Sequence, residues 1–493
     1  MSKSYRPWAP EQSYLLPPSP TDWLPEGHLA YFVLEVVREL DISAIEGAIQ
    51  EKDSRGTRPY SPRMMTALLL YAYSVGVFSS RKIERGTYED VAFRVIAAGQ
   101  QPVYTTINGF RLDHRDALSG LFLQVLKLCR RAGLGSLGHV SLDGSKVQAN
   151  ASKHKAMSYA RMAEEDKRLM AEIEKLLFSA EEADRRDDAR YGEGQREEDL
   201  PESFRHKAGR QQKIREAMSA LEAEAKEARA AELRELAEKQ RERASASDDE
   251  RTRKSATTLA TQSDAKADKL APRKDDDDED PNGGAGDLPQ HRVSTTADGA
   301  PAPKAQRNFT DADSRIMVRN GAFLQAFNAH LVVNEDQVIV AHAVTNQAPD
   351  VEHLVPMLEQ VEDNCGVRPV ALSADSGYFS EANARHCARA GIDAHIAVGR
   401  KEDGAIGRLP MSAAAAARSQ MHDKLTTSRG KELYARRKAI IEPVFGQIKQ
   451  AMGFRRFSLR GLAKVPQEWG IVCLCHNLLK LWRHGLRIGL AAG

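Results

Sequence analysis

The chain has 493 residues, of which 41% are hydrophobic and 28% charged, with a mean hydropathy of −0.50. This length exceeds what one hydrophobic core usually organises, so we expect two or three structural units, part of them strongly solvated. The net charge of +2 does not by itself suggest a nucleic-acid partner, but it averages two unlike parts of the chain. Residues 161–280 hold 26 Lys and Arg against 34 Asp and Glu, so the rest of the chain has a net charge of +10. That excess suits a polyanionic ligand.

Signals for export, membrane insertion and disulfides are weak. Residues 1–20 lack the apolar segment of a signal peptide. The longest uncharged stretch, 64–80, is at the short margin for a membrane span, and we interpret it as a buried helix. The five cysteines include no C-x-x-C pair, which predicts reduced thiols in a cytoplasmic protein. Cys473, Cys475 and His476 lie in an apolar run, where buried packing is a better interpretation than a metal site.

Residues 1–135 are predicted to form an all-α domain that binds DNA. Apolar residues recur at helical spacing in the segments 28–41, 61–80 and 116–133. Basic and polar side chains between the last two segments could contact a DNA groove or backbone, as in a helix-turn-helix, with Arg81 and Lys82 as candidate DNA-binding residues. A plain helical bundle with a solvated basic face fits the same pattern equally well.

Residues 136–154 and 306–485 contain the predicted strands. The β-branched-rich runs are 138–147, 321–334, 337–345, 367–378 and 393–400, with helical segments at 351–366 and 380–391. This order predicts an α/β fold, a mixed sheet flanked by helices.

Residues 155–305 interrupt that fold just after its first strand. In 155–244, apolar residues at i, i+3/i+4 and i+7 predict a charged, coiled-coil-like helical hairpin, through which we expect self-association or pairing of DNA ends. Residues 245–305 are rich in Ser, Thr, Asp and Lys and are predicted to be a disordered acidic linker. The acidic run 275–280 belongs to that linker and is better interpreted as solvated than as a metal site.

Two aspartates mark a candidate catalytic site. Asp143 and Asp375 each end a predicted strand and are followed closely by a glycine. Ligand sites form at the carboxyl ends of strands in open α/β sheets. Two carboxylates there can hold Mg²⁺, and a pair of ions about 3.5–4 Å apart can activate a nucleophile and stabilise the leaving oxygen of a phosphodiester. Glu442 is the candidate third acid. Lys449 shares its helix face if the helix continues through Pro443, a residue that disfavours helical geometry.

The chain resembles the DDE transposases of bacterial insertion sequences. The segments that carry the resemblance are 141–156, 311–334, 372–387 and 434–481. The last is similar to the Y-R-E-K signature of one branch, here Tyr434, Arg437, Glu442 and Lys449, with the Tyr and Arg one residue further upstream of Glu442 than usual. Asp311 and Asp313 also belong to the resemblance, but a turn or cap role suits them better than metal binding.

The resemblance implies an RNase H-like catalytic fold for residues 136–154 and 306–485, in which Asp143, Asp375 and Glu442 bind two Mg²⁺ or Mn²⁺ ions. It implies cleavage of double-stranded DNA at terminal inverted repeats and strand transfer into target DNA. A homodimer in a synaptic complex would do this at the bacterial nucleoid, without a membrane. The side chains assigned to DNA are Tyr434, Arg436, Arg437, Lys438, Lys449, Arg455 and Arg456, which cluster beside the proposed metal site. A domesticated nuclease on the same fold and a non-catalytic DNA-binding or scaffolding protein are the alternatives.

Overall fold

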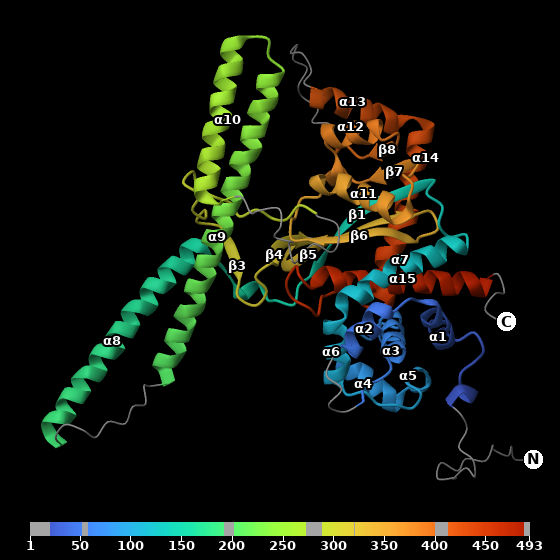
Figure 1. Ribbon diagram of the computed structural model, residues 1–493, viewed down its shortest axis with the longest axis horizontal. Helices are drawn as coiled ribbons and strands as arrows, with labels where there is room; N and C mark the ends of the chain where they lie inside the picture. The colour runs from blue at the N-terminus through green and yellow to red at the C-terminus, as the bar shows by residue number, and fades with distance from the viewer. Residues whose placement is uncertain are drawn as a thin grey trace, which may run out of the picture.

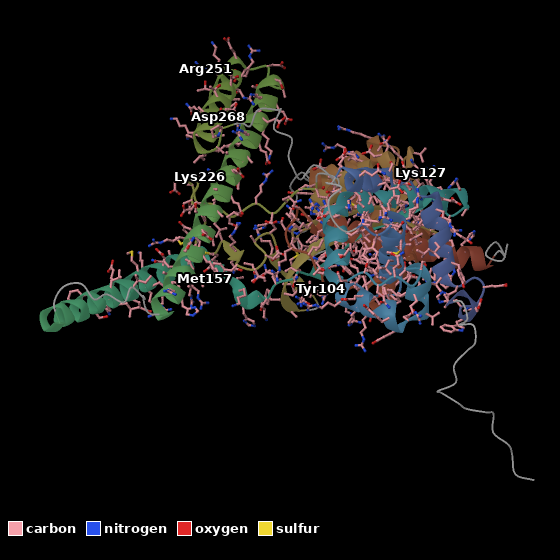
Figure 2. All side chains as sticks on the ribbon, turned by 60° about the horizontal axis from the view of Figure 1, so that its bottom comes forward. Tyr104, Lys127, Met157, Lys226, Arg251 and Asp268 are labelled. Atoms are coloured by element: carbon pink, nitrogen blue, oxygen red, sulfur yellow. The ribbon has the colours of Figure 1, made fainter. Side chains whose placement is uncertain are left out.

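The computed structural model describes residues 20–51, 58–191, 202–272, 288–319, 321–399 and 413–487. A central sheet with the N-terminal and C-terminal helices forms the body of the molecule, and a long helical arm projects from it (Figure 1). Figure 2 places Lys127 on the body and Lys226, Asp268 and Arg251 along the arm. The acidic run 275–280 lies outside the described residues.

The N-terminal region is helical, as predicted. After a 3-10 turn at Pro20–Trp23, its helices are α1 Leu29–Glu39, α2 Ser43–Gln50, α3 Pro62–Ser74, α4 Ser80–Glu89, α5 Val91–Ile96, α6 Tyr104–Asp113 and α7 Arg115–Arg131. Helix α3 is buried along most of its length because it packs against α1, α5 and the C-terminal helix α15 (Val465–Arg487). The uncharged stretch 64–80 therefore begins as a core helix. Within the described ranges, no helix is long and apolar enough to cross a membrane.

The sheet joins strands from both sides of the insertion. Its strands are β1 His139–Gln148, β4 Arg315–Arg319, β5 Ala322–Asn334, β6 Ile339–Thr345, β7 Ala371–Ala374 and β8 Asp393–Ile396. Hydrogen bonds order them β4-β5-β1-β7-β8, and β6 also pairs with β5. Strand β1 is antiparallel to β5 and parallel to β7, and β7 is parallel to β8. The predicted mixed sheet is confirmed with all five predicted strands, and β4 is additional.

Helices from the C-terminal half cover the sheet. They are α11 Leu354–Cys365, α12 Glu381–Arg389, α13 Ala413–Thr426, α14 Ser428–Gly446 and α15. Helix α14 packs across β1, β5, β7 and β8, whereas α15 packs on β6 and along α7. The positions of α14 and β1 together set the candidate site.

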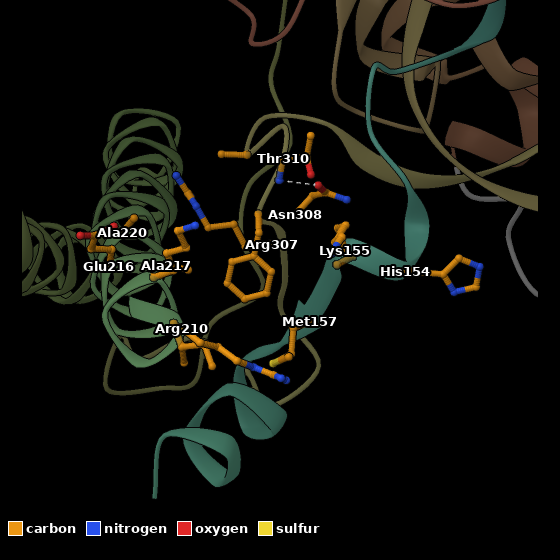
Figure 3. A pocket seen from close by; sticks show the side chains of 15 residues that line it. His154, Lys155, Met157, Arg210, Glu216, Ala217, Ala220, Arg307, Asn308 and Thr310 are labelled. Atoms are coloured by element: carbon orange, nitrogen blue, oxygen red, sulfur yellow. Dashed lines mark hydrogen bonds between the residues drawn. The ribbon is translucent and has the colours of Figure 1, made fainter. Parts of the chain in front are cut away.

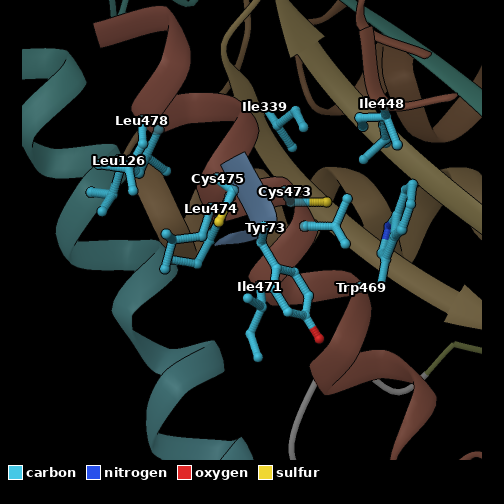
Figure 4. Close-up of a cluster of buried hydrophobic side chains, with 14 of the residues drawn as sticks. Tyr73, Leu126, Ile339, Ile448, Trp469, Ile471, Cys473, Leu474, Cys475 and Leu478 are labelled. Atoms are coloured by element: carbon cyan, nitrogen blue, oxygen red, sulfur yellow. The ribbon is translucent and has the colours of Figure 1, made fainter. Parts of the chain in front are cut away.

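One hydrophobic core runs from the N-terminal helices into the sheet. Figure 4 shows Tyr73 of α3, Leu126 of α7 and Ile339 of β6 around Cys473 and Cys475 of α15. Both cysteines are buried free thiols, as predicted, and burial raises the pKa of Cys475 to about 12. The helices of residues 1–135 therefore share their core with the sheet and do not pack as a separate unit.

Helix α14 continues through Pro443 and then widens into a π-helix, Gln447–Ala451. Proline has no N–H, so the carbonyl of Ala439 loses its helical hydrogen bond. Nε2 of Gln337, in the β5–β6 turn, donates to that carbonyl at 2.9 Å instead. The sequence left open whether the helix continues through Pro443, and it does, because a side chain from elsewhere in the chain replaces the missing bond. The π-turn, which closes over i→i+5, displaces Lys449 from the face expected of a continuous α-helix.

The insertion enters and leaves the body through a two-stranded ribbon, β2 Ala156–Ser158 paired with β3 Gln306–Asn308. Beyond it, α8 Tyr159–Tyr191 and α9 Glu202–Ser245 pack together as the predicted helical hairpin. Met162 and Leu169 of α8 meet Ile214 and Leu221 of α9 in a small core. The apolar stripe predicted further along α8 is not buried, since Met170 and Leu177 are 43% and 40% exposed.

Residues 245–305 are not a disordered linker in the parts that the structure describes, which corrects the prediction. Helix α10, Glu250–Leu270, packs along α9. The residues that this helix buries are small: Ala256, Ala260, Ser263 and Ala267. Small side chains at helical spacing let two backbones approach closely, a signal that composition alone does not register. Further on, Leu288 joins the main core, and Val293 and Ala305 join the core of the arm.

Candidate active site

Asp143 and Asp375 lie beside each other on adjacent parallel strands. Strands β1 and β7 pair in register up to Leu142 opposite Ala374, so the next residue on each strand is an aspartate. Asp375 directly follows β7, as predicted. Asp143 does not end its strand, because β1 stays paired with β5 on its other side as far as Gln148. It stands where β7 diverges from β1, so the two carboxyl groups meet at that edge of the parallel pairing.

The two carboxyl groups share a partly buried environment. Burial raises the pKa of Asp143 to about 6, although Arg437 opposes this shift and Asp375 adds to it. Burial also raises the pKa of Asp375. Nη1 of Arg437 donates to Oδ2 of Asp143 at 3.0 Å, and the two side chains are only 13% and 21% exposed. Neighbouring like charges away from water favour binding of a counter-cation.

Basic side chains surround the pair. Besides Arg437, Nζ of Lys449 donates to Oγ of Ser145, and burial lowers the pKa of this lysine. Nζ of Lys146 lies 3.0 Å from Oδ1 of Asp350. A rim of ammonium and guanidinium groups beside carboxylates is the environment in which a phosphodiester is held while its reacting phosphate faces a metal.

Asp350 is a residue of this site that the sequence analysis missed. Its Oδ1 accepts hydrogen bonds from Nζ of Lys146 at 3.0 Å and from Nδ2 of Asn328 at 2.7 Å. It follows β6, whose carboxyl end lies at the same edge of the sheet as that of β1, because both strands are antiparallel to β5. Its place before the 3-10 turn Val351–His353 resembles a helix cap. The signal that could have found it is the one used for Asp375, an acid just after a strand.

Two glycines leave room for the carboxylate of Asp350. A Cβ on Gly377 would lie 3.1 Å from an oxygen of Asp350 and 3.1 Å from one of Asp375. A Cβ on Gly144 would lie 3.1 Å from Asp350 and 3.1 Å from the side-chain oxygen of Asn328. Any other residue at either position would have to push these oxygens aside, which explains why a glycine accompanies each aspartate.

Glu442 is not gathered with the two aspartates. It is exposed on α14 and has no hydrogen bond or ion pair to any residue that the structure describes. Helix α14 nevertheless packs on β1, and its Arg437 reaches Asp143. In the described part of the chain, no three His, Cys, Asp or Glu side chains form a group that could hold a metal. The role of Glu442 as a third metal ligand stays a prediction.

The other candidate DNA-binding residues of α14 differ in their surroundings. The ring of Tyr434 lies 5.9 Å from the Arg437 guanidinium, so it borders the site. Arg436 points elsewhere, with an ion pair of 3.0 Å to Glu335 in the β5–β6 turn. Lys438 is exposed. Of these three residues, Tyr434 is the one that contacts Arg437, whose guanidinium holds Asp143.

The remaining candidates lie on two other elements. Arg455 and Arg456 are exposed in the loop after the π-helix, where Arg456 donates to Oδ1 of Asn150. Arg81 and Lys82 are exposed on α4, where the Arg81 guanidinium lies 4.9 Å from the ring of Tyr104. Their contact with DNA stays a prediction.

Asp311 and Asp313 hold a loop, which favours the structural role over metal binding. Oδ1 of Asp311 accepts from the backbone N–H of Gly461 at 3.2 Å, and Oδ2 of Asp313 accepts from that of Leu462 at 2.8 Å. They fix the segment after the π-helix against the start of β4.

The raised pKa of Asp143 predicts a pH-dependent stability. The carboxyl group titrates near 3.8 when unfolded and at about 6 when folded, so the folded state retains a proton that the unfolded state releases. The stability it contributes is complete below about pH 4 and is lost as the pH rises to about 6, by roughly 3 kcal/mol. Urea denaturation from pH 4 to 7 in a chelator should show a flatter profile for Asp143→Asn. Superimposable profiles would contradict the assignment.

Two family models match the chain. A transposase DDE domain matches residues 294–478, and a second model, described as a transposase domain (DUF772), matches residues 18–113. Together they cover more than half of the chain. The chain belongs to the DDE transposases. Searches of curated proteins and of solved structures returned no match.

The family assignment and the geometry support each other in this transposase. The mixed sheet with flanking helices is the RNase H-like fold of the family, and the first match contains Asp375 and Glu442. Asp143 lies outside both matches. Its place in the site therefore depends on the pairing of β1 with β7, which sets it beside Asp375.

DDE transposases generally use divalent metal ions. The chemistry of the donor set fits such an ion, since Asp143 and Asp375 offer hard oxygen ligands and burial makes both carboxylates costly to ionise without a cation. Magnesium is usually held by one or two carboxylates together with waters and substrate phosphate. The two aspartates therefore supply the number of protein carboxylates that a magnesium ion usually binds.

Proposed function

We propose that this transposase cleaves DNA at the terminal inverted repeats of its element and joins the ends to target DNA in a reaction that requires two Mg²⁺ or Mn²⁺ ions. The observation that carries the proposal is the pairing of Asp143 with Asp375 at the point where β7 leaves β1. Metal-dependent phosphoryl transfer needs carboxylates in a fixed, partly dry position beside groups that bind phosphate. Arg437 and Lys449 supply the second requirement.

Each residue has a distinct part in this proposal. Asp143 and Asp375 would hold the ions, which when bound activate the attacking oxygen and stabilise the leaving one. Glu442 would complete the ligand set from α14. Arg437 holds Asp143 through its hydrogen bond of 3.0 Å and, with Lys449, would bind a phosphate of the transposon end. Gly377 leaves room for Asp350 beside Asp375, and Gly144 leaves room for Asp350 beside β1.

The partners follow from the same proposal. Double-stranded DNA provides both the inverted-repeat ends and the target, and we propose a homodimer that holds two ends in one synaptic complex at the bacterial nucleoid. The α8–α9 hairpin is the proposed element of self-association. Removing residues 155–305 and finding the same oligomeric state would exclude that role.

The experiment uses DNA that flanks the gene, because it contains the ends on which the enzyme acts. Purified full-length protein is incubated with a labelled end duplex and a target plasmid in Mg²⁺, in Mn²⁺ and in a chelator. Cleavage and joined products only in the presence of a divalent ion are the expected result. Cleavage without joining would indicate a nuclease, and binding without either reaction would indicate a DNA-binding protein.

A further inference from the structure

A groove between the arm and the body lies outside the site described above. It has a volume of about 770 Å³, and the ribbon β2–β3 and helix α9 line it (Figure 3). Its basic lining residues are Lys155, Arg210, Lys213 and Arg307, against the single carboxylate of Glu216. The volume is in the range of ligand sites, and the lining has more positive than negative side chains.

The lysines of this groove are unpaired. Lys155 and Lys213 are exposed and form no ion pair with a residue that the structure describes. Arg210 and Arg307, in contrast, are held by Glu165 and Glu224. The groove therefore has two fixed cations that shape its walls and two free ones that a polyanion could neutralise.

One wall of the groove is apolar. Ile214, Ala217 and Ala220 of α9 form it, and the ring of Phe309 is 37% exposed beside it. A nucleic-acid backbone presents sugars as well as phosphates, so a groove with both an apolar wall and ammonium groups suits it better than it suits a small inorganic anion.

The groove is connected to the aspartates by a row of basic residues. Strand β1 runs from Asp143 to Gln148, whose backbone N–H donates to the carbonyl of Arg455 at 3.3 Å. Nε of Arg460 donates to the carbonyl of Asn150 at 3.0 Å. The chain then passes Lys153 and His154 before it reaches Lys155 in the groove. Exposed cations thus accompany the chain from the catalytic edge to the arm, and the members of this row outside the groove are Lys153, Arg455, Arg456 and Arg460.

We infer that the groove binds the sugar-phosphate backbone of the DNA whose end lies at Asp143 and Asp375, with Lys155 and Lys213 as its phosphate ligands. This inference rests on the proposed function. Asp143 and Lys155 are separated by twelve positions in the sequence, a distance of at most about 43 Å in an extended chain. At about 3.4 Å per base pair, a duplex that reaches the groove extends no more than about 13 base pairs from the site.

The test uses a double variant of the groove, in which Lys155 and Lys213 are both replaced with glutamine. A matched control carries the same replacement at Lys226 and Lys239. The control lysines are exposed on α9 outside the groove and form no ion pair with a described residue (Figure 2 marks Lys226). Fluorescence anisotropy measures the affinity of the full-length chain for end duplexes of about 6 and about 20 base pairs, roughly 20 and 68 Å long, at several salt concentrations.

The groove variant is expected to bind the long duplex several-fold more weakly, with a salt slope smaller by roughly two, one unit for each lost phosphate contact. Its affinity for the short duplex should fall less, because fewer phosphates of that duplex can reach the groove. Equal salt slopes for wild type and variant, or the same loss in the control, would overturn the inference. So would a changed oligomeric state in size-exclusion chromatography with unchanged DNA binding, which would make the groove a protein interface. Metal-dependent cleavage of the end is measured separately, so failure of the proposed function is distinguishable from failure of the groove.

Discussion

Replacement of Asp375 with asparagine is expected to reduce metal-dependent cleavage of the end duplex by at least about a thousandfold. A metal ion supplies several kcal/mol of transition-state stabilisation, and each 1.36 kcal/mol is a factor of ten in rate. Asparagine preserves the shape of the side chain and one of its oxygens, but it removes the negative charge that binds the ion. Initial cleavage rates at saturating Mg²⁺ measure the effect.

A control variant and a second measurement distinguish loss of the metal ligand from loss of the fold. Asp363→Asn makes the same change at an exposed position on α11, and should leave cleavage intact. The Asp375 charge raises the pKa of Asp143, so in Asp375→Asn the pKa of Asp143 should fall below about 6. NMR titration of the apo protein follows that fall and at the same time reports an intact fold. A folded variant that still cleaves would refute the assignment of the site.

The same assay decides the position of Glu442. If it completes the ligand set, Glu442→Gln should lose activity to a similar degree. Glu432→Gln, an exposed acid earlier on α14, should not. Because Glu442 has no partner among the described residues, its loss should leave stability within about 0.5 kcal/mol of wild type. Full activity of the Glu442 variant would restrict the carboxylates of the site to those at the sheet edge.

The parts of this molecule that sequence could predict are those set by local pattern. Alternation and β-branched residues identified the strands, and an acid beside a glycine identified Asp143 and Asp375. That Asp143 and Asp375 lie side by side could not be predicted without the register of β1 against β7. Asp350 was missed because its local surroundings suit a cap, and its relation to Lys146 exists only once β6 and β1 share an edge.

Features that depend on distant contacts were not predictable. Pro443 breaks a helical hydrogen bond locally, and only the side chain of Gln337, distant in sequence, shows why α14 continues. Helix α10 has almost no large apolar residues, and its burial depends on the facing surface of α9. The boundary at 135 marks a change of pattern, but the core crosses it, since α7 packs against α15.

A second large effect is expected at Glu468 in α15, which is 1% exposed and holds the basic loop beside the site. Its carboxylate accepts from the backbone N–H groups of Ser458 at 3.1 Å and Leu459 at 3.0 Å, and from the Ser458 hydroxyl. Burial raises the pKa of Glu468, while these hydrogen bonds and the charge of Arg111 oppose the shift. The carboxylate therefore accepts the hydrogen bonds that these backbone N–H groups would otherwise make to water, in a loop without regular secondary structure.

Glu468→Ala is expected to lower the free energy of unfolding by about 3–5 kcal/mol, because two backbone N–H groups lose their acceptor and each unsatisfied group costs about 1–3 kcal/mol. Glu468→Gln keeps one acceptor oxygen and should cost roughly half as much. Urea denaturation followed by tryptophan fluorescence measures both, since Trp469 is buried next to the mutated residue.

The loop carries Arg455, Arg456 and Arg460, so the alanine variant should also bind the long duplex more weakly under conditions where it remains folded. A loss of stability below about 1 kcal/mol would mean that the loop is held by Asp311 and Asp313 alone.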